Sequence, residues 1–200
     1  MNRNDVALET RKTLLDGFIS IDRLHLRHRL FAGGWTGLLQ REVNRGGKVA
    51  AVIPYDPVRD ELVLIEQFRI GPFTADDPEP WLTEIVAGMI EPGENAAEMA
   101  RRETQEETGC AIGRLEKIMD FYSTPGGSAQ RIALFCAEVQ AASAHGIHGL
   151  AVEGEDIRVL TKSTDEALAM VQSGTIRNAI SIIGVQWLAL NRDALRRRWA

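Results

Sequence analysis

Three glutamates at helical spacing are the most chemically distinctive feature of this sequence. Glu103, Glu106 and Glu107 stand at i, i+3 and i+4, so on a helix their side chains would share one face, about 5–6 Å apart. Carboxylates this close repel one another and raise each other's pKa. Divalent cations relieve that repulsion, and hard ions such as Mg²⁺ and Mn²⁺ prefer oxygen ligands and often share them with substrate phosphates. The spacing therefore indicates a candidate metal site for a phosphorylated molecule.

A solvated acidic helix face is the simpler explanation of the same residues. Arg101 and Arg102 lie one turn from Gln105 and Glu106, and exposed salt bridges between such neighbours contribute under about 1 kcal/mol. Taken alone, the three glutamates favour this explanation. The residues on either side of them must decide between the two.

Capping signals predict the helix that carries the glutamates. Asn95 and Glu98 have the form of a capping box, with Asn95 as the N-cap and Glu98 as the third helical residue. Gly109 suits the position just after the last turn, so the helix is expected to end near Thr108. Strand patterns surround it, and they cover residues 48–54, 61–68, 81–86, 115–122, 131–139 and 156–162.

The remaining segments complete an α/β pattern. The first two of those strands are joined by a turn at 55–60, which predicts a hairpin buried on both faces. Further strands are expected at 17–22, 24–31 and 35–43, with a turn at Gly33-Gly34. We expect loops at 71–80 and 141–154, the second long and mobile. A short helix should begin at Ser163 or Thr164 and end at Gly174, and an amphipathic helix should run from Asn178 to about Arg197.

Composition excludes several classes of protein. The 200 residues are 44% hydrophobic and 26% charged, which excludes disorder, and the net charge of −5 argues against a nucleic-acid or anionic-membrane partner. The two cysteines, Cys110 and Cys136, form no zinc or disulfide pattern. No signal-peptide core and no apolar run of the ~20 residues needed to span a membrane is present. We therefore expect a cytoplasmic α/β protein with an N-terminal β appendage.

The residues around the glutamates match a longer motif. Gly88, Glu94, Arg102, Glu103, Glu106, Glu107 and Gly109 occupy the fixed positions of the Nudix box, G-x5-E-x7-R-E-U-x-E-E-x-G-U, where U is aliphatic. Thr104 and Cys110 stand at the two U positions and are less apolar than usual. The chain is thereby identified as a member of the Nudix superfamily. The resemblance implies an α/β/α sandwich with a mixed sheet and an N-terminal antiparallel β appendage.

Over nearly its full length the chain resembles one branch, the bacterial ADP-ribose pyrophosphatases. The segments that carry the resemblance include residues 27–31, 56–60, 65–69, 86–90, 146–150 and 153–156, together with Pro125 after the box. It implies a dimerisation region at 1–45, a hydrolase domain at 46–200 and a homodimer. It also implies Mg²⁺-dependent hydrolysis of ADP-ribose to AMP and ribose 5-phosphate, with Mn²⁺ as the other candidate ion.

Site residues carry over from this branch by position. The implied metal ligands are the Ala87 carbonyl and the carboxylates of Glu103, Glu106, Glu107 and Glu155. Glu153 is implied as the general base, although its role and that of Glu155 could be exchanged. Arg102 would orient the cluster. Without the resemblance, Glu153 and Glu155 would be taken for solvated loop acids.

Substrate contacts also follow only from the resemblance. It places Phe18 and Ile19 against the adenine and Arg41 and Arg69 near phosphate or ribose, while Met89 and Thr124 are weaker assignments. For Phe18, a strand core residue is an equal alternative. Two other functions stay open, namely a pyrophosphatase for another nucleoside diphosphate sugar such as GDP-mannose and a sensor that binds ADP-ribose without cleaving it.

Overall fold

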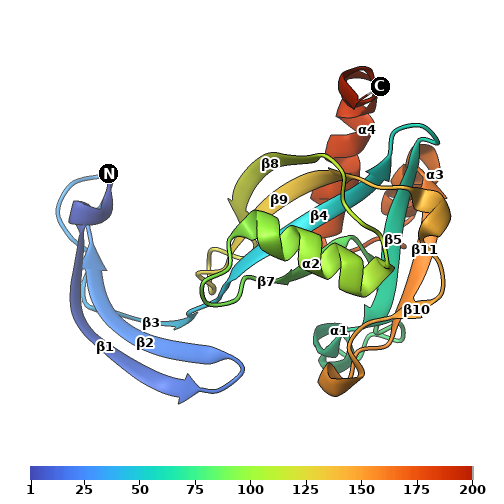
Figure 1. Ribbon diagram of the computed structural model, residues 1–200. Helices are drawn as coiled ribbons and strands as arrows, with labels where there is room; N and C mark the ends of the chain where they lie inside the picture. Colours follow the sequence, from blue (N-terminus) through green and yellow to red (C-terminus); the bar gives the residue numbers. More distant parts are fainter. Residues whose placement is uncertain (200) are drawn as a thin grey trace. The chain divides into compact units, whose positions relative to one another are not determined.

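The structure, a computed structural model, describes residues 1–199. The chain forms two compact units (Figure 1). The first comprises Met1–Lys48 and Tyr122–Arg131, and the second comprises Val49–Phe121 and the chain from Ile132 onward. Across residues 1–199, no helix is both long and apolar enough to cross a membrane.

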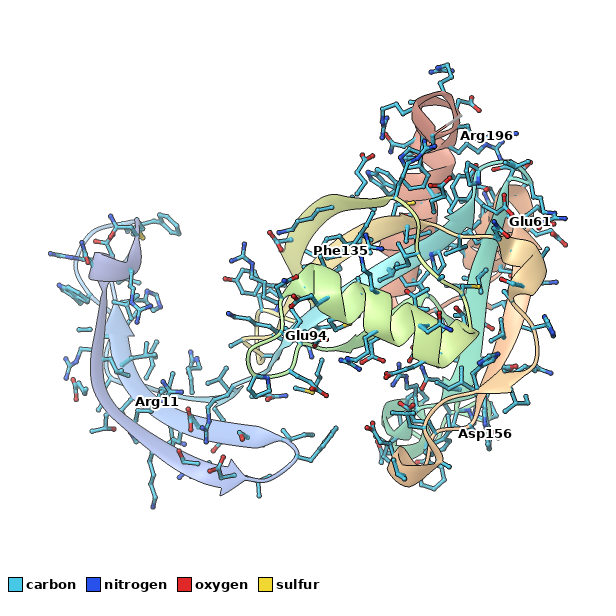
Figure 2. All side chains as sticks on the ribbon, viewed as in Figure 1. Arg11, Glu61, Glu94, Phe135, Asp156 and Arg196 are labelled. Atoms are coloured by element: carbon cyan, nitrogen blue, oxygen red, sulfur yellow. The ribbon has the colours of Figure 1, made fainter. Side chains whose placement is uncertain are left out.

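The first unit is a three-stranded antiparallel sheet. After a short 3₁₀ turn, η1 (Arg3–Asp5), its strands are β1 (Val6–Asp16), β2 (Ser20–His28) and β3 (Leu39–Asn44), in the order β1-β2-β3. Every residue of β1 is exposed. On β2, Asp22 is buried and accepts hydrogen bonds from Arg11 Nε (2.6 Å) and Thr13 Oγ1 (2.9 Å). A charged side chain therefore fills the place that an apolar core residue usually takes; Arg11 is labelled in Figure 2.

The sequence did not predict β1. Because β1 is exposed on both faces and mixes apolar with charged residues, it lacks the alternation that marks a half-buried strand. The strands expected at 17–22 and 24–31 are a single strand, β2, and residues 17–19 form the turn before it. The third strand begins at Leu39 rather than at Trp35, which makes only an isolated bridge with Arg29. The turn at Gly33-Gly34 is confirmed by positive φ at both residues.

The second unit is built on an eight-stranded sheet. Its main path is β10-β11-β5-β4-β9-β8, with β6 paired to β5 and β7 paired to β4. The strands are β4 (Lys48–Asp56), β5 (Glu61–Phe68), β6 (Trp81–Glu84), β7 (Val86–Met89), β8 (Leu115–Tyr122), β9 (Arg131–Glu138), β10 (Ile147–His148) and β11 (Ile157–Ser163). The helices are α1 (Ile70–Thr74), α2 (Ala96–Thr108), α3 (Thr164–Gln172) and α4 (Ala179–Trp199), and two 3₁₀ turns are η2 (Ala141–Ser143) and η3 (Ala151–Glu153).

Helices cover both faces of this sheet, with α2 on one face and α3 and α4 on the other (Figure 1). Alternate residues of the central strands divide between the two faces. Leu62 and Leu64 of β5 belong to a core cluster with Val185 of α4, whereas Ile65 belongs to a cluster with Met99 of α2. The expected α/β/α layering and mixed sheet are confirmed.

The hairpin expected from β4 and β5 is present and both of its strands are largely buried, but they pair with each other only at the tip, where Tyr55 faces Leu62 and Asp56 faces Glu61. Two other local expectations need correction. The strand expected at 81–86 is two strands, because the Ile85 amide leaves the ladder and donates to Ser181 Oγ at 2.9 Å. The loop expected at 71–80 overlaps helix α1, and the loop expected at 141–154 contains η2, β10 and η3. Such short elements carry too few residues for a periodic signal.

Candidate metal and phosphate site

Helix α2 is defined by the signals that its sequence carries. Asn95 Oδ1 accepts from the amides of Ala97 (2.9 Å) and Glu98 (3.0 Å), and Glu98 Oε2 in turn accepts from the Asn95 amide at 2.8 Å. Gly109 closes the helix in the left-handed region, with φ +71°. The predicted capping box and helix end are therefore confirmed.

The buried face of α2 includes one of the three glutamates. Thr104, Glu107 and Thr108 are all buried, although two of them are polar and one is charged. Thr104 fits its site because its hydroxyl donates to the Ala100 carbonyl at 2.7 Å. Glu103 and Glu106 are partly buried. The three carboxylates therefore differ in environment, and a fully solvated acidic face is excluded.

Arg102 holds the outer part of the carboxylate group together. Its Nε donates to Glu94 Oε1 at 3.0 Å, and its Nη1 donates to Glu103 Oε1 at 2.9 Å and to Glu106 Oε2 at 3.0 Å. This hydrogen bonding lowers the pKa of Glu94. Glu94, labelled in Figure 2, lies in the loop before α2. Arg102 thus connects Glu94 of the loop with Glu103 and Glu106 of the helix.

Glu107 is the exceptional member of the group. It is only 3% exposed, and its Oε2 has no hydrogen-bond partner among residues 1–199. Burial raises its pKa to about 9, with Glu103, Glu155 and Glu84 adding to the effect and Arg69 opposing it. Burial also raises the pKa of Glu103, against the influence of Arg102. Without a cation, burial thus disfavours the charged form of both carboxyls.

Glu103 lies against the backbone of β7. A Cβ atom on Gly88 would come within 2.2 Å of Glu103 Oε1. Only glycine therefore leaves room for this carboxylate beside the strand that carries Ala87. In register, Ala87 faces Ala51 of β4. Met89 ends the strand and is 54% exposed.

The first of our predictions concerns Gly88→Ala. The added methyl must push the end of the Glu103 side chain away, because that side chain is more flexible than the β7 backbone. We expect hydrolysis to fall about 10-fold to 10²-fold, the range for displacing a catalytic group by roughly 1 Å, while the melting temperature changes by only a few degrees. Gly93→Ala is a control for the loss of a glycine near the box, since no atom lies within 4 Å of a Cβ there, although its φ of +93° adds local strain. Full activity in Gly88→Ala would contradict the placement of Glu103.

Glu155 reaches this region from the loop between β10 and β11. Its Oε2 accepts from the Leu150 amide at 3.1 Å, and its charge raises the pKa of both Glu103 and Glu107. The loop bends at Gly149, with φ +96°, where a Cβ would lie 2.7 Å from the Glu155 Cβ. Glu153 is exposed at the end of η3, and in the described chain its side chain makes no hydrogen bond or ion pair. The structure thus brings Glu155, but not Glu153, to the carboxylates.

Arg69 adds a positive charge to the same group. Its Nε donates to Glu84 Oε2 at 2.8 Å, and Glu84 is 7% exposed. The resemblance implied Arg69 as a phosphate or ribose contact, whereas nothing in the sequence pattern had pointed to Glu84. An acidic residue at the end of a buried strand, in Trp-Leu-Thr-Glu, is the signal that could have identified it.

The donor chemistry of this group fits a divalent cation. Carboxylates are hard oxygen donors, and the unpaired Glu107 Oε2 leaves an acceptor buried without a counter-charge. Within residues 1–199, however, no three Asp, Glu, His or Cys side chains converge closely enough to hold an ion by themselves. Mg²⁺ is commonly bound through one or two carboxylates together with water and substrate phosphates. The group therefore suits an ion that shares its ligands with a phosphorylated substrate.

The other expected substrate contacts lie in the first unit. Phe18 and Ile19 form the exposed β1–β2 turn, and Phe18 is 99% exposed, which excludes the alternative of a strand core residue. Arg41 is exposed on β3, with its Nη1 donating to the Gln40 carbonyl at 2.8 Å. Thr124 is exposed in the 123–128 loop. The carboxylates, Arg69 and Met89 belong to the second unit.

Comparisons with known proteins show the family to which the chain belongs. The NUDIX domain model matches residues 46–169. An ADP-ribose pyrophosphatase of Escherichia coli (strain K12) is 46% identical over 198 residues, covering 99% of this chain and 94% of that protein. The Haemophilus influenzae ADP-ribose pyrophosphatase is 42% identical over 202 residues, covering 99% and 92%.

More distant similarities are also found. A GDP-mannose pyrophosphatase of Cronobacter sakazakii is 38% identical over 151 residues, covering 76% of this chain and 78% of that protein. A crystal structure of an ADP compounds hydrolase superposes with a TM-score of 0.71 at 17% identity, covering 92% of this chain and 95% of that one. At that identity the structural match supports the fold alone.

Proposed function

Since the chain belongs to the Nudix family, we propose that it hydrolyses the pyrophosphate bond of ADP-ribose to AMP and ribose 5-phosphate with a divalent cation, Mg²⁺ or Mn²⁺. The observation that carries this proposal is the buried and unpaired carboxylate of Glu107 within the intact box. Burying this carboxyl without a partner destabilises the protein, and a bound cation would offset that cost. The near full-length similarity to two ADP-ribose pyrophosphatases supports the choice of substrate.

Glu103 and Glu107, with the Ala87 carbonyl, would be the principal ligands of the ion, and Glu106 and Glu155 would add further oxygens when substrate phosphates and water complete the coordination. When bound, such an ion neutralises charge on the phosphate oxygens and lowers the pKa of a bound water. Arg102 keeps Glu103 and Glu106 in place through its two hydrogen bonds. Arg69, fixed by Glu84, offers the guanidinium group that suits a phosphate.

Glu153 is proposed as the general base that takes the proton of the attacking water. Its neighbour Glu155 already lies near Glu103 and Glu107, and Gly154 between them has φ +72°. A modest movement of this exposed loop would bring Glu153 towards the substrate, as in enzymes whose loops close on binding. Phe18 and Ile19 would contact the adenine, and Arg41, Met89 and Thr124 would complete the substrate contacts.

A second copy of the chain is the proposed partner of the first unit. No apolar side chain in residues 1–48 or 122–131 is buried, and several are strongly exposed, among them Leu8 (57% exposed) and Phe31 (97% exposed). A small sheet with so little buried apolar surface gains stability by covering it. We expect light scattering during gel filtration to give twice the chain mass of 22.1 kDa. A mass of one chain at micromolar concentration would argue against the homodimer.

A comparison of substrates tests the proposed function. ADP-ribose should give AMP with the highest kcat/KM, ahead of GDP-mannose, UDP-glucose and FAD. GDP-mannose is the second candidate, because a GDP-mannose pyrophosphatase shares 38% identity over 76% of this chain. A higher kcat/KM for GDP-mannose would transfer the proposal to that substrate. Binding of ADP-ribose without any product, at every Mg²⁺ and Mn²⁺ concentration, would indicate a sensor.

A further inference from the structure

The ion pair of Arg69 and Glu84 joins a buried carboxylate to a guanidinium that a ligand can reach. Arg69 Nε donates to Glu84 Oε2 at 2.8 Å, and Nη2 lies 2.7 Å from the same oxygen. The Arg69 side chain is 40% exposed, whereas that of Glu84 is 10% exposed. Within residues 1–199, the Nη1 group of Arg69 makes no hydrogen bond. Glu84 therefore engages one side of the guanidinium and leaves Nη1 without a protein partner.

Backbone pairing fixes where this ion pair lies. In the ladder of β5 and β6, Glu84 faces Ile65. The Arg69 amide donates to the Pro80 carbonyl at 2.9 Å, just beyond the end of the ladder. Ile65 packs in the cluster that contains Met99 of α2. Because directly opposed residues of paired strands share a face, Glu84 lies on the face of the sheet that α2 covers.

Glu107 of α2 is a second possible acceptor for the Arg69 guanidinium. Its Oε2 is buried and has no hydrogen-bond partner among residues 1–199. The charge of Arg69 lowers the pKa of Glu107, so the two groups are close enough to interact. Arginine forms strong, charge-assisted hydrogen bonds with carboxylates. A guanidinium released by Glu84 would therefore pair with Glu107 and occupy an oxygen that the proposed cation needs.

We infer that Glu84 is a positioning residue, which keeps the Arg69 guanidinium away from Glu107 so that Arg69 can bind the diphosphate and Glu107 the cation. This inference rests on the proposed function and adds a residue that acts on the site through Arg69. Glu84 is suited to this role because its carboxylate is buried, and a buried carboxylate that loses its partner destabilises the protein strongly. The free protein therefore maintains the pair before substrate arrives.

The test compares wild type with Glu84→Gln, which keeps the shape of the side chain and removes the charge that holds Arg69. ADP-ribose binding is measured by calorimetry in EDTA, where neither cation nor turnover contributes. We expect the dissociation constant to rise about 10-fold, the lower end of the range for loss of a hydrogen bond to a charged group. Loss of a negative charge would by itself tighten binding of an anionic ligand. The expected change is therefore opposite in sign to a simple charge effect.

Two further backgrounds show whether Glu84 acts through Arg69. Arg69→Met removes the guanidinium, so the addition of Glu84→Gln should then raise the dissociation constant by less than twofold or lower it. Glu107→Gln removes the charge of the competing acceptor. It should therefore restore more affinity to the Glu84→Gln protein than it adds to wild type.

Glu66→Gln is the matched control at a neighbouring position of the same two strands. Glu66 forms an ion pair with Arg158 and faces Thr83, the residue before Glu84. Removal of its charge should leave ADP-ribose binding within twofold of wild type. Thermal unfolding in EDTA should place Glu84→Gln within a few degrees of wild type, because the substitution changes charge but not volume. If wild type shows no binding in EDTA, the comparison is made in saturating Mg²⁺ with the α,β-methylene analogue of ADP-ribose, whose P–C–P bridge resists hydrolysis.

Each outcome bears on a defined part of the account. Unchanged or tighter binding by Glu84→Gln would overturn the inference and leave the proposed function intact. An equal loss of affinity in the Arg69→Met background would overturn it too, because Glu84 would then act without Arg69. A melting temperature of Glu84→Gln several degrees below that of wild type would have the same consequence, since it would show a structural role. If wild type itself neither binds nor cleaves ADP-ribose, the proposed function fails.

Discussion

Replacing Glu107 by glutamine is expected to lower kcat/KM for ADP-ribose by about 10³-fold or more, since it removes a charged ligand at the centre of the site. The same substitution should make the metal-free protein more stable. Glu107 is 3% exposed and its Oε2 has no partner among residues 1–199, so without a cation its carboxyl must take up a proton on folding, which costs stability at neutral pH. Loss of activity together with a gain in stability distinguishes a functional carboxylate from a structural one.

The pH dependence of stability provides an independent check. Burial raises the pKa of Glu107 to about 9 in the folded protein, whereas a carboxyl of an unfolded chain titrates near 4.3. Between these values the folded state holds a proton that the unfolded state has lost, so stability falls as pH rises. Thermal unfolding in EDTA should show this decline in wild type and a smaller one in Glu107→Gln. Identical slopes for the two proteins would show that Glu107 is not buried as described.

Glu153→Gln should reduce kcat by about 10²-fold to 10³-fold, the range for loss of a general base. Affinity for Mg²⁺ should be unchanged, because the exposed Glu153 side chain makes no hydrogen bond or ion pair within residues 1–199. Glu155→Gln should act differently and raise the Mg²⁺ concentration needed for half-maximal rate, since Glu155 lies near Glu103 and Glu107. Steady-state rates measured over a Mg²⁺ series separate the two effects.

The same two variants can also contradict the assignment. If Glu155→Gln lowers kcat at saturating Mg²⁺ and Glu153→Gln changes only the metal requirement, the two roles must be exchanged. Glu98→Gln serves as the matched control, because Glu98 caps α2 through its hydrogen bond to the Asn95 amide and has no place in the site. It should affect stability and leave the Mg²⁺ dependence unchanged.

Helix α2 was predictable because its determinants are local. The capping pair Asn95 and Glu98, the terminal Gly109 and the spacing of the glutamates all lie within one short segment. The spacing alone left a solvated face open, however, and only the wider motif pointed to a site. Burial of Glu107 depends on how α2 packs against the sheet, which no short pattern contains.

The residues that sequence reasoning missed depend on contacts between distant segments. Glu84 can be placed on the inward face only once β5 and β6 are paired in register, with Ile65 opposite it. The break at Ile85 depends on Ser181 of α4, far along the chain. Strand β1 was missed for the opposite reason, since an exposed strand has no buried face to impose alternation. For Glu84 and for the break at Ile85, the deciding interaction lies outside the segment.

The most direct test of the account is the formation of AMP from ADP-ribose by protein stripped of metal with EDTA and then supplied with Mg²⁺. No AMP should form before the addition, many turnovers per chain should follow it, and Glu107→Gln should form AMP at least about 10³-fold more slowly at the same Mg²⁺ concentration. Equal AMP formation with and without a divalent ion, or undiminished turnover by Glu107→Gln, would contradict the central claim that the α2 carboxylates hold the ion on which hydrolysis depends.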